Sequence, residues 1–222
     1  MLSSNKKPVV VFGATPLAEL AAYLITEERQ VLAHVVDDGY RTQTSLNGIP
    51  VLEISELPAA CPPDSHELVV PLGFSRINGL RQQKCDELEA MGYTLSSYRH
   101  PSSQCWQGLQ QQANTLIFEG VIVQPFVRIG RNVILRAGTN LGHHSTVGDH
   151  CFIASGVTTG GNVSIGQRCF IGLGAVLRDG VRIADRCFIG AGAVVISDTE
   201  EDGVYVGNPA KKMAKTSAEV TR

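Results

Sequence analysis

The 222-residue sequence predicts two parts, an N-terminal α/β unit and a C-terminal all-β coil of six-residue repeats. Two observations predict this fold class. Strand-like and helix-like patterns alternate over residues 8–100, and from Ile117 to Val195 every sixth residue except Thr159 is a branched aliphatic. We expect the α/β unit at residues 1–104, the coil at 105–200 and a C-terminal segment at 201–222.

The N-terminal elements alternate between strands and helices. PVVVFGA is an apolar run that ends in a glycine turn, and TPLAELAAYLITEE carries apolar residues at helical spacing, with Pro16 in its first turn. The later segments are VLAHVVDD, ELVVPLGF, NGLRQQKCDELEAMG and YTLSSYRHP, and Gly92 stops the second helix. This alternation predicts a small parallel sheet with helices packed on it.

The first strand–helix turn is a candidate ligand site, because ligands bind such sheets at the carboxyl ends of the strands. Gly13 could offer backbone N–H groups to a phosphate, and Asp37 or Asp38 could accept hydrogen bonds from a ribose or a uracil. GATPLA lacks two glycines of the dinucleotide fingerprint, which disfavours NAD or FAD. An ordinary tight turn with solvated acids is the alternative.

The six-residue period fits neither an α-helix nor a simple amphipathic strand. It is typical of a hexapeptide β-helix, in which three hexads form one triangular turn. The aliphatic residue points into the prism, and a small or β-branched residue follows four places later. We expect four to five turns, stacked roughly 4.8 Å apart like neighbouring strands.

Residues 18 positions apart occupy the same place on successive turns. The phrases HCFIA, RCFIG and RCFIG therefore predict an interior ladder of Cys151, Cys169 and Cys187 that packs as small hydrophobes rather than as a zinc or redox site. They also predict an outer ladder of Phe152, Phe170 and Phe188, which would be either an oligomer contact or a covered wall.

Composition excludes several functional classes. The formal charge of −2, without a dense basic block, disfavours a nucleic-acid or membrane-surface binder. No apolar run approaches the roughly 18–20 residues of a membrane span, and the N-terminal run is too short for the core of a signal peptide. We therefore expect a soluble cytoplasmic protein.

Three of the six histidines lie in LGHHSTVGDH, residues 141–150. The repeat does not require a histidine at His143 or His144, and an imidazole can take up a proton at neutral pH, so His143 is a candidate general base. A zinc site is the alternative. Because adjacent side chains on an extended chain point to opposite faces, we expect no metal at this pair.

Together with the closing VYVGNPAKKM, this pattern resembles bacterial sugar acyltransferases that join a Rossmann-like unit to a left-handed β-helix. These include UDP-4-amino-sugar N-acetyltransferases of bacillosamine synthesis, perosamine N-acyltransferases and relatives of the sialic acid O-acetyltransferases. The resemblance covers nearly the whole chain. It implies a homotrimer that acetylates the amino group of a nucleotide-linked sugar, in surface-polysaccharide (lipopolysaccharide) or glycan biosynthesis, with acetyl-CoA or another acyl-CoA between adjacent coils.

The resemblance also implies roles for individual residues. The catalytic base falls on His143, and His144 stands where relatives carry an acid. Acyl-CoA, including its oxyanion at Gly161, would contact Gly161, Gly172, Leu173, Gly190, Ala191, Asn208, Pro209 and Lys211. The nucleotide sugar would contact Gly13, Ala14, Thr15, Asp37, Asp38, Gly73 and Arg81.

Two alternatives remain open at this point. One is a sugar O-acetyltransferase, or an acyltransferase acting on an acceptor without a nucleotide. The other, of a different class, is a trimeric ligand-binding protein without catalytic activity. Replacing His143 distinguishes an enzyme from a binding protein, because only an enzyme has turnover to lose.

Overall fold

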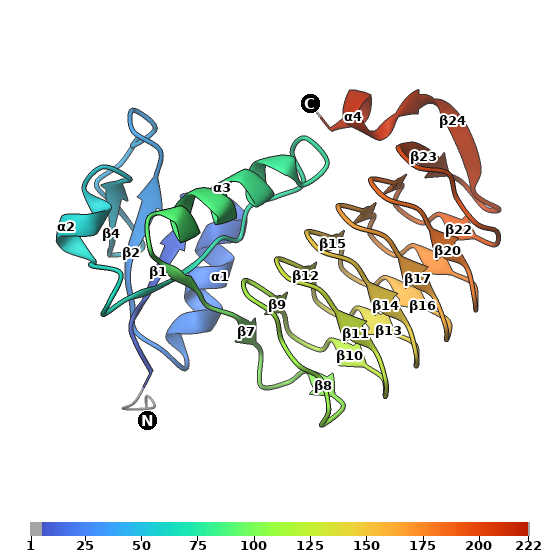
Figure 1. Ribbon diagram of the computed structural model, residues 1–222, viewed down its shortest axis with the longest axis horizontal. Coiled ribbons are helices and arrows are strands. Elements are labelled where there is room, and N and C mark those ends of the chain that lie inside the picture. Colours follow the sequence, from blue (N-terminus) through green and yellow to red (C-terminus); the bar gives the residue numbers. More distant parts are fainter. Residues whose placement is uncertain (1–5, 222) are drawn as a thin grey trace. The chain divides into compact units, whose positions relative to one another are not determined.

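The computed structural model describes residues 6–221, which form two compact units (Figure 1). Unit 1 contains the chain up to Gly73 and Gln83–Ser97; unit 2 contains Phe74–Gln82 and the chain from Tyr98 onward. This differs from the expected boundary at residue 104. The segment 74–82 groups with the coil, and the coil begins at Tyr98 because β7 (Tyr98–Arg99) already pairs in register with β9 (Leu116–Ile117).

Unit 1 is built around a six-stranded sheet in the order β3-β4-β2-β1-β5-β6. Its strands are β1 (Val9–Phe12), β2 (Val31–Val36), β3 (Ser45–Leu46), β4 (Ile49–Glu53), β5 (Glu67–Val69) and β6 (Thr94–Leu95), all parallel except the hairpin of β3 with β4. The helices are α1 (Pro16–Thr26), α2 (Leu57–Ala60) and α3 (Gly79–Ala90), and α3 contributes residues to both units. The segment YTLSSYRHP, expected as one strand, forms β6 and β7 in different sheets.

Local sequence explains the first strand–helix turn. All four residues of β1 are buried, and Gly13 follows with a φ of +107°, a conformation that favours glycine. Thr15 caps α1, since its hydroxyl oxygen accepts a hydrogen bond from the Ala18 N–H at 3.3 Å. Pro16 occupies the first helical position, where no backbone N–H is needed.

Unit 2 is a coil with three walls, each a parallel sheet in which a residue pairs with the one 18 positions later. The first wall contains β7, β9, β12 (Ile134–Leu135), β15 (Phe152–Ile153), β18 (Phe170–Ile171), β21 (Phe188–Ile189), β23 (Gly203–Val206) and the antiparallel β24 (Lys211–Thr216). The second contains β8 (Gln104–Cys105), β10 (Ile122–Val123), β13 (Asn140–Leu141), β16 (Thr158–Thr159), β19 (Val176–Leu177) and β22 (Val194–Val195). The third contains β11 (Arg128–Ile129), β14 (Thr146–Val147), β17 (Ser164–Ile165) and β20 (Arg182–Ile183). The chain ends in α4 (Ser217–Val220).

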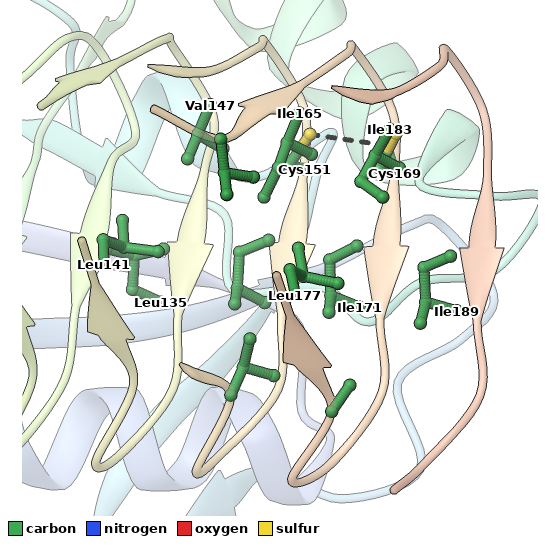
Figure 2. Packing of buried hydrophobic residues seen from close by; sticks show 14 of the residues in the cluster. Leu135, Leu141, Val147, Cys151, Ile165, Cys169, Ile171, Leu177, Ile183 and Ile189 are labelled. Carbon is green, nitrogen blue, oxygen red and sulfur yellow. Dashed lines mark hydrogen bonds between the residues drawn. The ribbon is translucent and has the colours of Figure 1, made fainter. Parts of the chain in front are cut away.

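The interior of the coil holds the predicted aliphatic ladder, as Figure 2 shows for Leu135 to Ile189. The cysteine ladder is also confirmed: all three thiols are fully buried, and the Cys169 N–H donates to Cys151 Sγ at 3.3 Å. Burial raises the pKa of the Cys187 thiol to about 11, so this group stays neutral at physiological pH.

The phenylalanine ladder is a covered wall rather than a bare one. The Phe74 ring lies 4.1 Å from the Phe170 ring and 6.1 and 6.3 Å from those of Phe152 and Phe188, centroid to centroid. The chain's own segment 74–82 therefore packs against the first wall.

Each hexad ends at a corner where one residue has a positive φ. At the first corner, between the first and second walls, these residues are Gly120, Gly138, Gly156, Gly174 and Gly192. At the second corner they are Phe126, His144, Asn162 and Gly180. At the third corner they are Asn114, Asn132, His150, Arg168 and Arg186. Within residues 6–221, no helix has the length and apolar character that crossing a membrane requires.

Candidate active site

His143 and His144 lie together at the second corner. Their Nδ1 atoms are 3.1 Å apart and both side chains are exposed. The expectation that they point to opposite faces is wrong, because His144 has a φ of +59° and the chain is turning rather than extended. One Nδ1 must donate and the other accept, which fixes opposite tautomers in a neutral pair.

The His143 ring lies against the backbone of Gly161, one turn further along the coil. A Cβ on Gly161 would lie 2.4 Å from His143 Cε1 and 2.6 Å from Nε2, so only glycine leaves room for the imidazole. The backbone of His143 is held by its N–H, which donates to Gln124 Oε1 at 3.1 Å, and by its carbonyl, which accepts from the Asn162 N–H at 2.8 Å.

The expected role of Gly161 as an oxyanion donor does not fit this geometry. Its N–H donates to Asp179 Oδ1 at 2.7 Å and is therefore already used. Gly161 instead provides the surface on which the His143 ring rests.

Aromatic side chains flank the histidine pair on one side. The Phe126 ring lies 4.6 Å from the His144 ring and 5.7 Å from the Trp106 ring, centroid to centroid. Trp106 and Phe126 also line a cavity of about 350 Å³, together with Leu109 and Arg128. Sequence reasoning missed Phe126, although it stands 18 residues before His144 and thus at the same corner.

The residues expected to contact CoA lie at the first corner and the end of the coil. Leu173 is 59% exposed there, and a Cβ on Gly172 would lie 2.6 Å from the Ala191 N atom, so glycine permits close stacking of the turns. Gly190 donates its N–H to the Tyr205 carbonyl at 2.8 Å. The segment with Asn208, Pro209 and Lys211 is beside this corner, since Val194 N–H donates to Gly207 O and Val194 O accepts from Ala210 N–H.

The first and second corners are different edges of the prism. Leu173 follows His143 by 30 residues, which is one full turn of 18 plus 12, so the two positions differ by one wall. A wall of six residues spans on the order of 20 Å. The coil brings His143, His144 and Gly161 together but does not bring Leu173 or Ala191 to them.

In unit 1, the expected nucleotide-contacting residues gather at the carboxyl ends of β1, β2 and β5. Gly13 follows β1, its N–H donates to the Val35 carbonyl at 2.7 Å, and its own carbonyl lies 2.8 Å from His34 Nδ1. Burial lowers the pKa of His34, which favours the neutral imidazole that donates from Nδ1 to this carbonyl. Ala14 and Thr15 complete the turn into α1, and Gly73 ends the segment after β5.

The two aspartates after β2 have different partners. Lys84 Nζ lies 2.5 Å from Asp37 Oδ1, whereas Asp38 Oδ1 accepts a hydrogen bond from the Ser55 N–H at 3.1 Å. Sequence reasoning missed Lys84, because its position on α3 does not reveal which strand end it reaches.

Arg81 does not fit a role in nucleotide binding. It belongs to unit 2, is completely buried, and donates to Asn132 Oδ1 at 3.0 Å and to the carbonyls of His150 and Cys151 at 2.8 and 3.0 Å. Its guanidinium also donates to Asn78 Oδ1 at 3.0 Å. These bonds attach the segment 74–82 to the third corner of the coil.

Residues 162–197 match the bacterial transferase hexapeptide family of six repeats. The coil is a hexapeptide-repeat β-helix. No protein with a curated description matches the chain.

Solved structures extend the similarity beyond the β-helix. The acetyltransferase domain of PglB from Neisseria gonorrhoeae is 25% identical, with a TM-score of 0.84 and coverage of 94% of this chain and all (100%) of that one. PerB from Caulobacter crescentus, in complex with CoA and GDP-perosamine, is 26% identical, with a TM-score of 0.84 and coverage of 96% and 100%. WeeI from Acinetobacter baumannii, at 21% identity, TM-score 0.71 and coverage of 94% and 100%, shares the fold. Both units of this chain therefore have counterparts in sugar acetyltransferases.

The third histidine of the cluster belongs to a different part of the β-helix. His150 is buried at the third corner, where its Nδ1 lies 2.8 Å from Asn132 Nδ2. Across the described residues, no group of three or more His, Cys, Asp or Glu side chains is arranged to hold a metal ion.

Proposed function

We propose that this protein is an acyl-CoA-dependent acyltransferase that acetylates the amino group of a nucleotide-linked amino sugar. The observation that carries the proposal is the His143–His144 pair, whose Nδ1 atoms lie 3.1 Å apart at an exposed corner of the β-helix. Support comes from perosamine N-acetyltransferase, which was solved with CoA and GDP-perosamine, also in mutants that replace one histidine by asparagine or alanine.

The chemistry follows from the tautomers. When His143 donates from Nδ1 to His144, its Nε2 has a free lone pair that can take a proton from the attacking amine. The amine nitrogen then forms a bond to the thioester carbonyl carbon, the carbon–sulfur bond breaks, and the proton passes from His143 to the departing CoA thiolate. Acetyl-CoA is a co-substrate that supplies the activated acyl group, so the buried cysteines have no part in the reaction.

We further propose a homotrimer in which acyl-CoA lies between the second corner of one protomer and the first corner of the next. Two facts support it. Within one protomer, Leu173 and Ala191 are one wall away from His143, so a site containing both needs a second copy. The second wall and its edges also expose apolar side chains, Ile122, Leu173, Val176 and Ile196, that a neighbouring copy would cover.

The finer features of the fold belong to the same proposal. We take the β-helix as left-handed and unit 1 as Rossmann-like. Gly13, Ala14 and Thr15 would receive the phosphates at the N-terminus of α1, and Asp37 and Asp38 the nucleoside. The parallel order β4-β2-β1-β5 supports this assignment, because the strand order reverses at β1.

Thiol release from acetyl-CoA, measured with UDP-, dTDP- and GDP-linked 4-amino sugars, tests the proposal. We expect turnover with one of them and a loss of roughly 10²–10⁴ in kcat for His143→Ala, with CoA binding retained. Reaction only with a free hydroxyl sugar would instead establish an O-acetyltransferase. Binding of CoA without turnover of any amine or hydroxyl acceptor would establish a binding protein.

The shared site has its own test. His143→Ala and Leu173→Glu protomers should each be inactive alone, since each lacks one half of every site. Mixed by co-expression, they should regain activity at roughly a quarter of the sites, where an intact second corner meets an intact first corner. A mixed trimer without activity would contradict a site built between protomers.

A further inference from the structure

Lys84 occupies an unusual place for a lysine. Its side chain is only 10% exposed, and its Nζ lies 2.5 Å from Asp37 Oδ1 and 2.7 Å from Glu87 Oε2. The same Nζ lies 5.6 Å from the centroid of the Phe12 ring. All four residues belong to unit 1.

These contacts place the ammonium group at the carboxyl end of the sheet. Phe12 is the last residue of β1, and Asp37 directly follows β2. Lys84 is on α3, which follows β5, and β5 lies on the other side of β1 from β2. Lys84 thus connects the two directions of chain winding at the reversal point, where ligands of open α/β sheets bind.

The charge of Lys84 is secure. Desolvation lowers the pKa of the amine, but the hydrogen bonds to Asp37 and Glu87 raise it further, so the net pKa lies above the usual value. The surrounding edge is acidic, since Asp38 and Glu53 accept hydrogen bonds from backbone N–H groups nearby. Without Lys84, the Asp37 carboxylate would add an unpaired negative charge where a nucleotide must bind.

Asp37 retains the capacity to bind a ligand. Lys84 uses its Oδ1, and the Asp37 side chain remains 38% exposed. A carboxylate held by one oxygen presents the other in a fixed direction, which lowers the entropy cost of a further hydrogen bond.

We propose that Lys84 is a positioning residue for the nucleotide part of the substrate: it orients Asp37 to accept a hydrogen bond from a hydroxyl or N–H of the nucleoside and offsets its charge near the phosphates. This inference rests on the proposed function. It assigns Lys84 no contact with the acyl group or with His143.

Binding of UDP, dTDP and GDP, each measured by calorimetry, tests the proposal with wild-type protein, Lys84→Met and Lys84→Arg. For the nucleotide that binds, we expect Lys84→Met to weaken binding about tenfold, as for the loss of one charge-assisted hydrogen bond. In kinetics it should raise KM for the nucleotide sugar and leave kcat and KM for acetyl-CoA within about twofold. Lys84→Arg should recover most of the affinity. The matched control is Lys7→Met, which removes the same charge from an exposed position before β1, at the opposite end of the strand.

A double-mutant cycle separates positioning from a general loss of structure. If Lys84 acts through Asp37, Lys84→Met should have no further effect on nucleotide binding in an Asp37→Ala background. Equal affinity of wild type and Lys84→Met, or an undiminished effect in the Asp37→Ala background, would overturn the inference while leaving the acyltransferase proposal intact. Failure of the wild type to bind any of the three nucleotides would reject both.

Discussion

His143 Nδ1 and His144 Nδ1 are 3.1 Å apart, and a hydrogen bond between two neutral imidazoles has one donor and one acceptor. The partner that orients the proposed base is thus an imidazole rather than a carboxylate. A neutral imidazole can hold the tautomer of His143, but it does not offset the positive charge that His143 acquires when it takes a proton.

Removing the His144 side chain should slow catalysis moderately. His144→Gly keeps the positive φ of this corner without strain, and it deletes the acceptor for the His143 Nδ1–H. We expect kcat to fall about five- to tenfold, the equivalent of one hydrogen bond of roughly 1 kcal/mol. His144→Asn, which tolerates the same φ and offers an acceptor oxygen, should retain most of the rate. A His144→Gly variant with full kcat would show that His143 needs no orienting partner.

Gly161→Ala should act through His143. The new methyl group would lie 2.4 Å from His143 Cε1, so the imidazole must move. We expect kcat to fall about tenfold or more, since an angstrom of misplacement is costly in catalysis, with little change in the melting temperature. The same substitution in a His143→Ala protein should change kcat no further; an additive loss there would point to a separate role for Gly161.

Arg81→Met should destabilise the protein rather than weaken substrate binding. The side chain is fully buried and its donors bind the coil, so its removal leaves buried acceptors without partners. Urea unfolding should show a loss of about 3–5 kcal/mol, and KM for the nucleotide sugar should be unchanged. Arg99→Met, at an exposed position of the coil, is the control. A raised KM with normal stability would restore Arg81 to the nucleotide site.

Stability should decline at alkaline pH because of the buried thiols. Burial raises the pKa of Cys187 from 9.0 to about 11, so between these values the unfolded chain loses this proton while the folded chain keeps it. Stability is therefore complete below pH 9 and falls as the pH rises, by at most about 1.4 kcal/mol per pH unit for each such thiol. Urea unfolding at pH 8, 9 and 10 measures the slope. Cys187→Ser should flatten it, and an unchanged slope would assign the effect to other groups.

The parts of the fold that repeat could be predicted from the sequence, because the repeat writes the register directly. Ile117 to Val195 fixed the inward positions, and the 18-residue spacing placed Cys151 beneath Cys169. His143 could be singled out because nothing in the hexad requires an imidazole there.

The non-local relationships could not be predicted in this way. Nothing in the local pattern near Phe74 or Arg81 indicates that this short segment packs against turns of the coil some 80–100 residues away. The convergence of His143 and His144 depends on a positive φ, which asparagine and glycine at Asn162 and Gly180, the equivalent corner positions, could have indicated.

The 18-residue register also constrains how such a chain can change its length. Losing or gaining 18 residues between the second corner and the C-terminus would alter the height of the prism by one storey and leave every later side chain above its old vertical line. A change of six residues would keep the same hydrophobic hexads, yet it would rotate everything beyond it by a third of a revolution, carrying Leu173 from one edge of the prism to another. Core packing alone would tolerate both events, but only the first preserves the angular relation between His143 and Leu173.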